Sequence, residues 1–469
     1  MISPERLSGM RVPGYIYASD RMMSSILSDN APQQVVNVAC LPGIVKASIA
    51  MPDIHWGYGF PIGGVAAFDL KEGVISPGGV GYDINCGVRL MTTNLSLKEL
   101  KPRLEKLLDK MFSLIPSGVG SSGQISLHER QLEEVALRGA EWAVNERGFG
   151  WDDDLLHTEE GGCMDGADFG AVSAKARQRG APQLGTLGSG NHFLEIQEID
   201  EVYDPEAAEA MGLRKGTVTV MIHTGSRGFG HQIADDYIKV MKSAMRKYGI
   251  EVPDIQLACA PVDSKEGKSY FAAMVAAANY AWANRQIITH RVREAFAAVF
   301  LVKPEELGLS LVYDVAHNIA KKETHLFEGK EIQLMVHRKG ATRAFPAGHP
   351  DVPEKYRSLG QPVLIPGDMG RYSFVLIGQP KAMESAFGST CHGAGRVMSR
   401  AKATKTTTPS SVKRALSERG IMVRAHTDAT LTEEVPEAYK DVADVVEVVH
   451  CVGLASKVVR MRPVAVIKG

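Results

Sequence analysis

The sequence predicts an α+β fold in one large domain that spans residues 1–469. Strand-like and helical patterns mix along the chain without the regular βαβ period of a doubly wound fold. No Pro/Ser/Gly-rich linker and no block of like charge divides it. Hydrophobic residues make up 44 % of the chain and charged residues 23 %, so 469 residues can bury a large core without disulfides.

The first part of the chain predicts strands and then a helix. Residues 35–95 show short strand patterns, such as 44–51 and 88–93, separated by glycine turns. A helix is predicted to begin at Ser96, because Ser96 and Glu99 have the spacing of a capping box. Apolar residues then fall on one helical face as far as Met111. Pro102 is expected to interrupt the first turn, after which the helix restarts.

The later elements alternate in type. Helices are predicted over 231–248, ending at Gly249, and over the alanine-rich residues 268–300. Strands are predicted at 217–223, 331–337, 361–366 and 373–378. Asp314 and His317 are spaced as if one helical turn apart, which suits either a metal ligand with its partner or a simple helix hydrogen bond. Residues 140–185 are polar and glycine-rich, and we interpret them as a long insertion or partly mobile loop.

Charge and composition exclude some classes of protein. The chain has 53 Lys+Arg and 54 Asp+Glu, which excludes a polycationic tail but not a local basic groove. No stretch approaches the roughly 18 apolar residues of a membrane span, and the first residues show no signal-peptide pattern. The 6 cysteines are scattered without a CxxC motif. We expect a cytoplasmic protein in a reducing compartment, with no membrane association.

The 47 glycines concentrate in clusters that also contain Asp, Cys or His. Each cluster places such a residue beside backbone that can turn sharply and offer N–H groups to an anion. The recurrence of this pattern indicates that the clusters contribute to one shared site. The clusters are residues 52–64, 76–87, 184–195, 222–230 and 389–396.

Three of the clusters predict metal binding. Asp83 and Cys86 can converge on one ion if the chain turns between them, and mixed oxygen, sulfur and nitrogen ligands suit a divalent transition ion. His223 follows a strand pattern, and His192 lies in a polar turn. The alternatives of a hairpin aspartate, a buried thiol and structural histidines remain open at this point.

A further cluster predicts phosphate chemistry. His392 is followed by small residues and by Arg396 and Arg400. Their N–H groups and guanidinium groups could hold phosphates around a histidine that attacks phosphorus. An ordinary loop before a helix is the alternative.

Taken together, these motifs resemble the RtcB family of RNA ligases, in order across essentially the whole chain. The resemblance implies a single compact α+β domain with mixed sheets surrounded by helices. It also implies a ligase that depends on GTP and Mn²⁺ and acts in tRNA splicing and RNA repair. Such enzymes join an RNA 3′-phosphate or 2′,3′-cyclic phosphate end to a 5′-hydroxyl end through a guanylated histidine. Their substrates include tRNA halves, and an archease-type activator is a candidate partner. The motifs that carry the resemblance are residues 51–64, 83–89, 188–195, 223–228, 392–400 and 468–469.

The resemblance also implies roles for individual residues. His392 would be the guanylated nucleophile. Cys86 would bridge two Mn²⁺ ions, with Asp83 and His192 completing one site and His223 and His317 the other. The residues expected to bind GTP are Asn191, Glu195, Asp368, Ser373, Gly393, Ala394, Gly395, Tyr439 and Lys468. The residues expected to contact phosphate or RNA are Arg227 and Arg396.

One position departs from the family pattern. Asp368 stands where many relatives have Ser. An acidic side chain there could accept hydrogen bonds from guanine N1–H and N2–H₂, or the change could be neutral.

Two other functions compete with ligation. A dinuclear metal phosphoesterase acting on RNA ends would use the same ligands but would not need the His392 loop. A non-catalytic RNA-binding protein would not need the complete set of ligands. The residues after that loop that are candidate phosphate contacts, although the pattern favours a solvated helix face, are Lys402, Lys405, Lys413 and Arg414.

Overall fold

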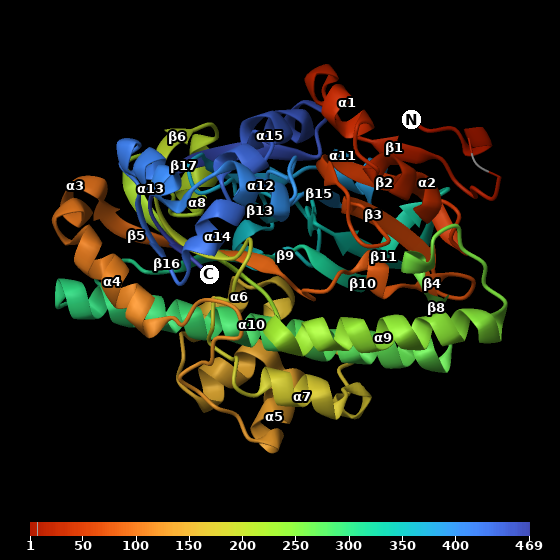
Figure 1. The fold of residues 1–469 in the computed structure, drawn as a ribbon, viewed down its shortest axis with the longest axis horizontal. Helices are drawn as coiled ribbons and strands as arrows, with labels where there is room; N and C mark the ends of the chain where they lie inside the picture. Colours follow the sequence, from red (N-terminus) through yellow and green to blue (C-terminus); the bar gives the residue numbers. More distant parts are fainter. Residues whose placement is uncertain (7) are drawn as a thin grey trace.

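Two sheets of mixed strand direction and a layer of long helices build the molecule (Figure 1). The computed structural model describes residues 1–6 and 8–469. The larger sheet has the strand order β13-β14-β17-β6-β7-β5-β9, with β16 pairing with β17 in parallel. Its strands are β5 (Gly87–Ser96), β6 (Phe193–Val202), β7 (Thr217–Thr224), β9 (Leu311–Ala316), β13 (Pro362–Ile365), β14 (Ser373–Gly378), β16 (Met422–Ala425) and β17 (Ala455–Lys468).

The second sheet has the order β1-β2-β3-β11-β10, and its β1–β2 pair is parallel. Two small antiparallel pairs, β12 with β15 and β4 with β8, complete the described strands. These strands are β1 (Gly14–Ile16), β2 (Ile44–His55), β3 (Ile62–Asp69), β4 (Val74–Ile75), β8 (Ala260–Pro261), β10 (Asn318–Phe327), β11 (Lys330–Lys339), β12 (Ala341–Arg343) and β15 (Ser389–Cys391).

The helical layer is built around its longest helix, α10 (Lys265–Phe300). It packs against α4 (Leu104–Leu114), α5 (Glu129–Glu141) and α9 (Arg227–Tyr248), and in Figure 1 α9 and α10 run lengthwise below the sheets. Its buried alanines allow neighbouring helices to approach closely. The other α-helices are α1 (Asp20–Leu27), α2 (Ala31–Val38), α3 (Leu97–Leu100), α6 (Asp152–Leu156), α7 (Ala174–Gly180), α8 (Pro205–Ala210), α11 (Pro380–Ala386), α12 (Arg400–Thr406), α13 (Pro409–Glu418), α14 (Asp428–Glu433) and α15 (Val442–Cys451).

The α+β prediction is confirmed, as are several local signals. Ser96 and Glu99 form the capping box, and a 3₁₀ turn containing Pro102 separates α3 from α4. Helix α9 ends at Gly249, whose φ of 63° is the left-handed conformation that favours glycine. No helix among the described residues is long and apolar enough to cross a membrane.

Three local predictions were wrong. Residues 35–38 belong to helix α2 rather than to a strand. Residues 140–185 contain helices α6 and α7 rather than a long loop, because the segment is fixed to the helical layer: buried Asp154 accepts hydrogen bonds of 2.6 and 2.7 Å from Arg293 of α10. Asp314 lies in strand β9 and not in a helix, because the chain there continues the sheet beside β5.

Alternation along the central strands decides which side chains face the helices. On β7, Val218, Val220 and Ile222 pack with α4 and α10 in one hydrophobic cluster. Since successive side chains of a strand point to opposite faces, His223 lies on the face away from these helices. The sheet thus separates an apolar layer from the face that carries the histidine.

A buried charge cluster joins the sheet to α10. Asp314 accepts hydrogen bonds from Arg285 and from Arg89, which lies opposite it on β5, each with a Nε–Oδ2 distance of 2.7 Å. All three side chains have zero exposure to solvent. We predict that Asp314→Ala lowers the free energy of unfolding by about 3–5 kcal/mol, because it leaves two buried cations unpaired. Urea unfolding would measure the loss, with exposed Asp351→Ala as control. Equal stability of the two variants would refute the prediction.

Candidate active site

Four neighbouring strands bring four of the candidate ligands to one edge of the larger sheet. Strands β5 and β6 begin at this edge, and the antiparallel strands β7 and β9 end there. Cys86 directly precedes β5, and His192 directly precedes β6. His223 is the penultimate residue of β7, and His317 directly follows β9. Residues up to 231 positions apart in the chain (86 to 317) are therefore neighbours in space.

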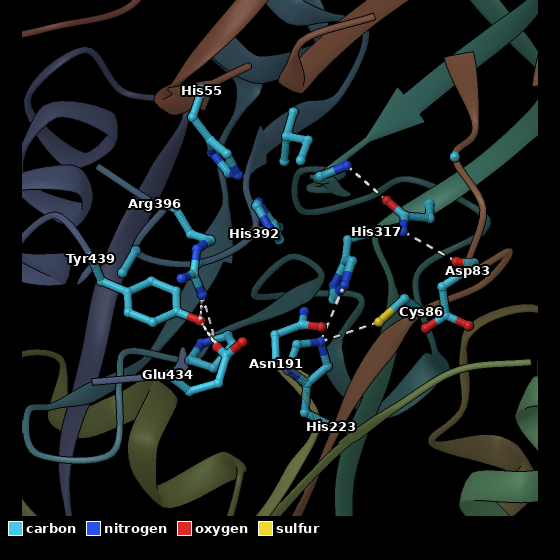
Figure 2. A pocket seen from close by; sticks show the side chains of 18 of the residues that line it. His55, Asp83, Cys86, Asn191, His223, His317, His392, Arg396, Glu434 and Tyr439 are labelled. Atoms are coloured by element: carbon cyan, nitrogen blue, oxygen red, sulfur yellow. Dashed lines mark hydrogen bonds and ion pairs between the residues drawn. The ribbon is translucent and has the colours of Figure 1, made fainter. Parts of the chain in front are cut away.

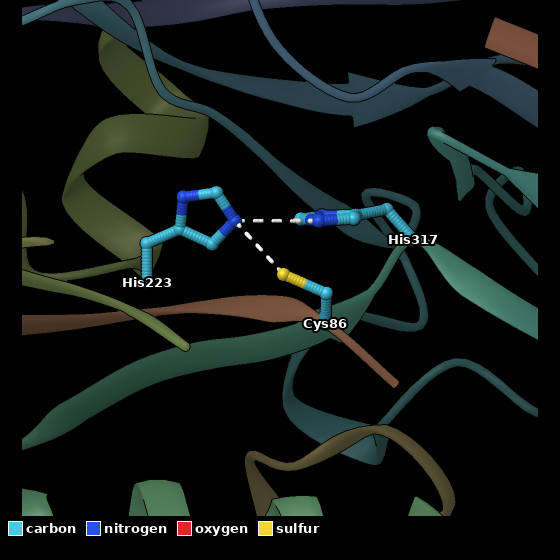
Figure 3. A group of neighbouring side chains, drawn as sticks. All are labelled: Cys86, His223 and His317. Carbon is cyan, nitrogen blue, oxygen red and sulfur yellow. Dashed lines mark hydrogen bonds between the residues drawn. The ribbon is translucent and has the colours of Figure 1, made fainter. Parts of the chain in front are cut away.

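The cysteine lies between two groups of possible ligands. Figure 3 shows Cys86 with His223 and His317; the Cys86 Sγ–His223 Nε2 and His223 Nε2–His317 Nε2 distances are both 3.3 Å. On its other side, Cys86 Sγ is 3.4 Å from His192 Nε2, which is 2.8 Å from Asp83 Oδ2. Within each group the ligand atoms lie within 4.8 Å of one another. The arrangement is that of two adjacent groups of candidate cation ligands that share one sulfur atom.

Electrostatics at this cluster suit metal binding. Burial lowers the pKa of His192, His223 and His317, which keeps their imidazoles neutral, as metal ligands must be. Burial opposes ionisation of Asp83, but His192 and Arg227 outweigh it and hold the pKa of the carboxyl below its ordinary value. Burial and the nearby Asp83 raise the pKa of the Cys86 thiol. A bound cation would reverse that last effect and favour the thiolate.

Contacts from α10 fix the turn that carries Cys86. Asn85 has a left-handed φ of 50°, and its buried side-chain amide donates to the carbonyl of Ala278 at 2.8 Å. Arg285 donates to the carbonyls of Asn85 and Thr224 at 2.8 and 2.9 Å, and so holds the start of β5 beside the end of β7. Sequence reasoning missed Asn85 and Arg285, because their roles depend on residues about 200 positions away.

His392 follows β15 and is held by a buried carboxylate. Asp53 of β2 accepts from the ring Nδ1 of His392 at 2.6 Å and from its backbone N–H at 2.9 Å. Asp53 is fully buried, and the ring of His392 lies 4.9 Å from that of His317. Because Nδ1 is engaged, Nε2 is the ring nitrogen left for chemistry. Sequence analysis noted the cluster around Asp53 but assigned it no role, since its partner is 339 residues away.

One cavity of about 350 Å³ joins His392 to the cysteine cluster. In Figure 2, His392 lies between the group of Cys86, His223 and His317 and the group of Arg396, Glu434 and Tyr439. The predicted GTP-binding and phosphate-binding residues that line this cavity are Asn191, Asp368, Gly393, Ala394, Gly395, Arg396, Tyr439 and Lys468.

Three of the predicted nucleotide- and phosphate-binding residues lie outside the cavity lining, as does the candidate metal ligand His192. Glu195 and Ser373 are buried on neighbouring parts of the larger sheet, and Gln197 donates to both, at 2.8 and 3.0 Å. Burial raises the pKa of Glu195 to about 8. Arg227 lines an adjoining groove, where its Nη1 lies 3.1 Å from His192 Nδ1.

Glu434 organises the opposite wall of the cavity, and sequence analysis missed it. Its buried carboxylate accepts from Arg396 at 3.1 Å, from Arg400 at 3.0 Å and from the Tyr439 hydroxyl. Arg396 also donates to the Tyr439 hydroxyl at 3.0 Å. The carboxylate thus holds the two arginine side chains at the cavity wall. No local sequence motif predicts this role for Glu434.

The two carboxylate oxygens of Asp368 differ in their hydrogen bonding. Its Oδ1 accepts from the Gly370 N–H at 3.0 Å, whereas buried Oδ2 has no hydrogen bond from any residue that the structure describes and lies 3.3 Å from Arg371 Nε. Burial raises the pKa of this carboxyl. The side chain therefore offers acceptor capacity at the wall of the cavity.

The basic residues after His392 favour the solvated-face interpretation. All four are exposed on α12 and α13, and none is among the residues that line the cavity. Lys413 pairs with Asp428, and Arg414 pairs with Glu418.

Known proteins resemble this chain along nearly its whole length. The family model described as tRNA-splicing ligase RtcB matches residues 34–469. The chain belongs to the RtcB family. A protein of Thermococcus kodakarensis named tRNA-splicing ligase RtcB is 59 % identical over 460 residues, covering 98 % of this chain and 95 % of that relative. Identically named relatives from Archaeoglobus fulgidus and Methanococcus maripaludis are 58 % and 54 % identical, with the same coverage. The RtcB resemblance drawn from the motifs is therefore confirmed.

Proposed function

We propose that this RtcB-family protein is an RNA ligase that uses GTP and Mn²⁺ to join a 3′-phosphate or 2′,3′-cyclic phosphate end to a 5′-hydroxyl end. The observation that carries the proposal is the position of His392. Its Nδ1 is bound to Asp53, and its ring shares a cavity with the cluster around Cys86. A phosphoesterase needs the metal ligands but has no use for a histidine held in this way.

His392 would act as the nucleophile toward the nucleotide. Its Nε2 attacks the α-phosphorus of GTP, an N–P bond forms, and the bond to pyrophosphate breaks. An oxygen of the RNA 3′-phosphate then attacks the same phosphorus, which breaks the N–P bond and frees the histidine. Finally the RNA 5′-hydroxyl oxygen attacks the 3′-phosphate, loses its proton, and GMP leaves. A 2′,3′-cyclic end would first be opened by water to the 3′-phosphate.

Asp53 would hold the proton on Nδ1 throughout these steps. The carboxylate stabilises the positive charge that the ring acquires when Nε2 bonds to phosphorus. Arg396 and Arg400 lie where they could neutralise phosphate oxygens.

The donor set fits two divalent cations. Asp83, Cys86 and His192 would hold one Mn²⁺, and Cys86, His223 and His317 the other. When bound, the ions supply neutralisation of phosphate charge and alignment of the attacking and leaving groups. Thiolate and imidazole ligands also suit Zn²⁺, which binds more tightly than Mn²⁺ in the general affinity order.

We further propose that residues 1–469 act as one catalytic domain and that the GTP-binding residues are those named from the family pattern. Glu195 and Ser373 are included on the family pattern alone, since neither lines the cavity. tRNA halves are the proposed physiological substrates, with an archease-type protein as activator, in the cytoplasm.

One assay tests the proposed reaction. The protein is incubated with GTP, Mn²⁺ and an RNA that carries 3′-phosphate and 5′-hydroxyl ends, and the products are separated on a denaturing gel. Circular or joined RNA supports ligation. Loss of the terminal phosphate without joining would instead support a phosphoesterase.

Asp53→Asn should slow guanylation of His392. The amide preserves size but removes the negative charge that supports the ring, and we expect a decrease of at least about 100-fold in the rate, by analogy with catalytic triads. Rapid-quench measurement of the covalent adduct gives this rate, with exposed Asp20→Asn as control. A rate within twofold of the unmodified protein would exclude the role of Asp53.

Asp368→Ser should weaken the preference for GTP over ATP. A charged acceptor for guanine N1–H and N2–H₂ is worth about 1.5–3 kcal/mol, so we expect the ratio of adduct-formation rates to fall at least about tenfold. The measurement compares the two nucleotides in Asp368→Ser and in the exposed control Asp351→Ser. An unchanged ratio would mean that Asp368 is a neutral variation.

A further inference from the structure

Three aromatic side chains form a row of neighbouring rings along the cavity wall beside Asp83. Tyr58 comes from the loop between β2 and β3, Tyr82 from the turn before β5, and His231 from α9. The centroids of Tyr58 and Tyr82 are 5.5 Å apart in an edge-to-face arrangement, and Tyr82 stacks on His231 at 5.1 Å. Both tyrosines are half-buried and His231 is exposed, so ring surface remains accessible.

The loops that carry the two tyrosines are fixed by buried contacts. The Lys339 ammonium donates to the carbonyls of Tyr58, Phe60 and Gly78, the last two at 3.0 and 3.2 Å. Gly59 donates to the side chain of Gln256 at 3.0 Å. Among the described residues, no hydrogen bond engages the hydroxyl of Tyr58 or Tyr82. The backbone is thus held in place while the polar end of each ring stays free.

A basic groove of about 450 Å³ adjoins this row of rings. The groove and the cavity share Asp83, Asn191, His231 and Arg400. Arg179 and Arg227 line the groove as well, so cationic groups dominate it. Aromatic rings beside a cationic groove are the arrangement by which proteins bind single-stranded nucleic acid: bases stack on the rings and phosphates contact the cations.

We propose that Tyr58, Tyr82 and His231 form a stacking surface for a nucleobase at the reacting end of the RNA. This inference rests on the proposed ligase function. It assigns RNA base binding to the part of the cavity that the nucleotide and metal sites do not use. An unpaired base would lie against the exposed face of His231, which extends the stack through Tyr82. Stacking depends on ring surface and not on hydrogen bonds, so this contact accommodates any base.

Variants of Tyr82 separate RNA binding from nucleotide chemistry. In Tyr82→Ala we expect the covalent GMP adduct to form at the unmodified rate and the KM for RNA to rise about tenfold, the typical effect of removing one stacked ring. Tyr82→Phe retains the ring and should restore the KM. His231→Ala should act in the same direction. Tyr248→Ala, on the same helix as His231 and 37 % exposed, is the control.

An abasic nucleotide makes the test specific to stacking. In the unmodified protein, loss of the terminal base at the 3′-phosphate end or at the 5′-hydroxyl end should raise the KM about tenfold, and the affected end is the one that stacks. In Tyr82→Ala the same loss should have no further effect. Additive effects of the two changes at both ends would overturn the proposal, as would failure of Tyr82→Phe to restore the KM.

A binding measurement keeps the inference distinct from the ligase function. Fluorescence anisotropy of a labelled 3′-phosphate RNA, without GTP, should show weaker binding to Tyr82→Ala than to Tyr82→Phe even if no ligation occurs. Equal binding by both variants would refute the stacking surface, whereas the absence of adduct in the unmodified protein would refute only the ligase function.

Discussion

His392→Ala is expected to form no covalent GMP adduct with GTP and Mn²⁺ and to lose RNA ligation completely. The substitution removes the ring nitrogen that would bond to phosphorus. Two other histidines that line the cavity, His223 and His317, have their Nε2 atoms within the cysteine cluster, so neither is placed to replace it. The fold should persist, because the ring of His392 lies at a cavity wall and is not part of a hydrophobic cluster.

Intact-mass spectrometry after incubation with GTP measures the adduct directly. The control is His450→Ala, which alters an exposed histidine at the end of α15 and should form the adduct normally. An adduct of normal abundance in His392→Ala would show that another residue is the nucleophile. A normal circular dichroism spectrum of the variant would show that any loss is chemical.

Cys86→Ala is expected to abolish both adduct formation and ligation, because it removes the sulfur that both candidate cation sites share. Each site then retains only two of its protein ligands. The cost to folding should be small, on the order of 1 kcal/mol, since a single buried sulfur is lost from a protein whose thiol is neutral without metal.

Mn²⁺ titration by isothermal calorimetry tests this assignment independently of activity. We expect the unmodified protein to bind Mn²⁺ at two sites and Cys86→Ala to lose high-affinity binding at both. Cys451→Ala, which changes an exposed thiol, should bind normally. Two tight sites in Cys86→Ala, or retained ligation, would contradict the bridging role.

Short-range patterns in the sequence were good guides to both fold and family. The capping box at Ser96, the interruption at Pro102 and the glycine that ends α9 depend on contacts within a few residues, so the local sequence encodes them. The motifs around Cys86, His223 and His392 were sufficient to identify the RtcB family, and the structure gathers them in one cavity. In the same way, the mixture of strand and helix periods predicted the α+β class.

The residues that sequence reasoning missed all act through distant partners. Asp53 acts on His392, Arg285 acts on the turn at Asn85, and Glu434 acts on two arginines of another segment. None of these pairs leaves a periodic or motif signal. The same limit explains the wrong prediction at Asp314. The spacing of Asp314 and His317 suited a helix, but the segment that contains Asp314 pairs with β5 and is a strand.

The sequence by itself determined which residue types would do the chemistry, where α3 begins and where α9 ends, because each of these features depends on residues close together in the chain. Only the tertiary structure decided how those residues meet. Antiparallel pairing of β5, β6, β7 and β9 places their ligand-bearing ends at one edge, and buried charge contacts from α10 and β2 hold the turn at Asn85 and the ring of His392. The physical reason is that strand pairing and buried ion pairs join residues hundreds of positions apart, and the geometry of the site exists only once those contacts have formed.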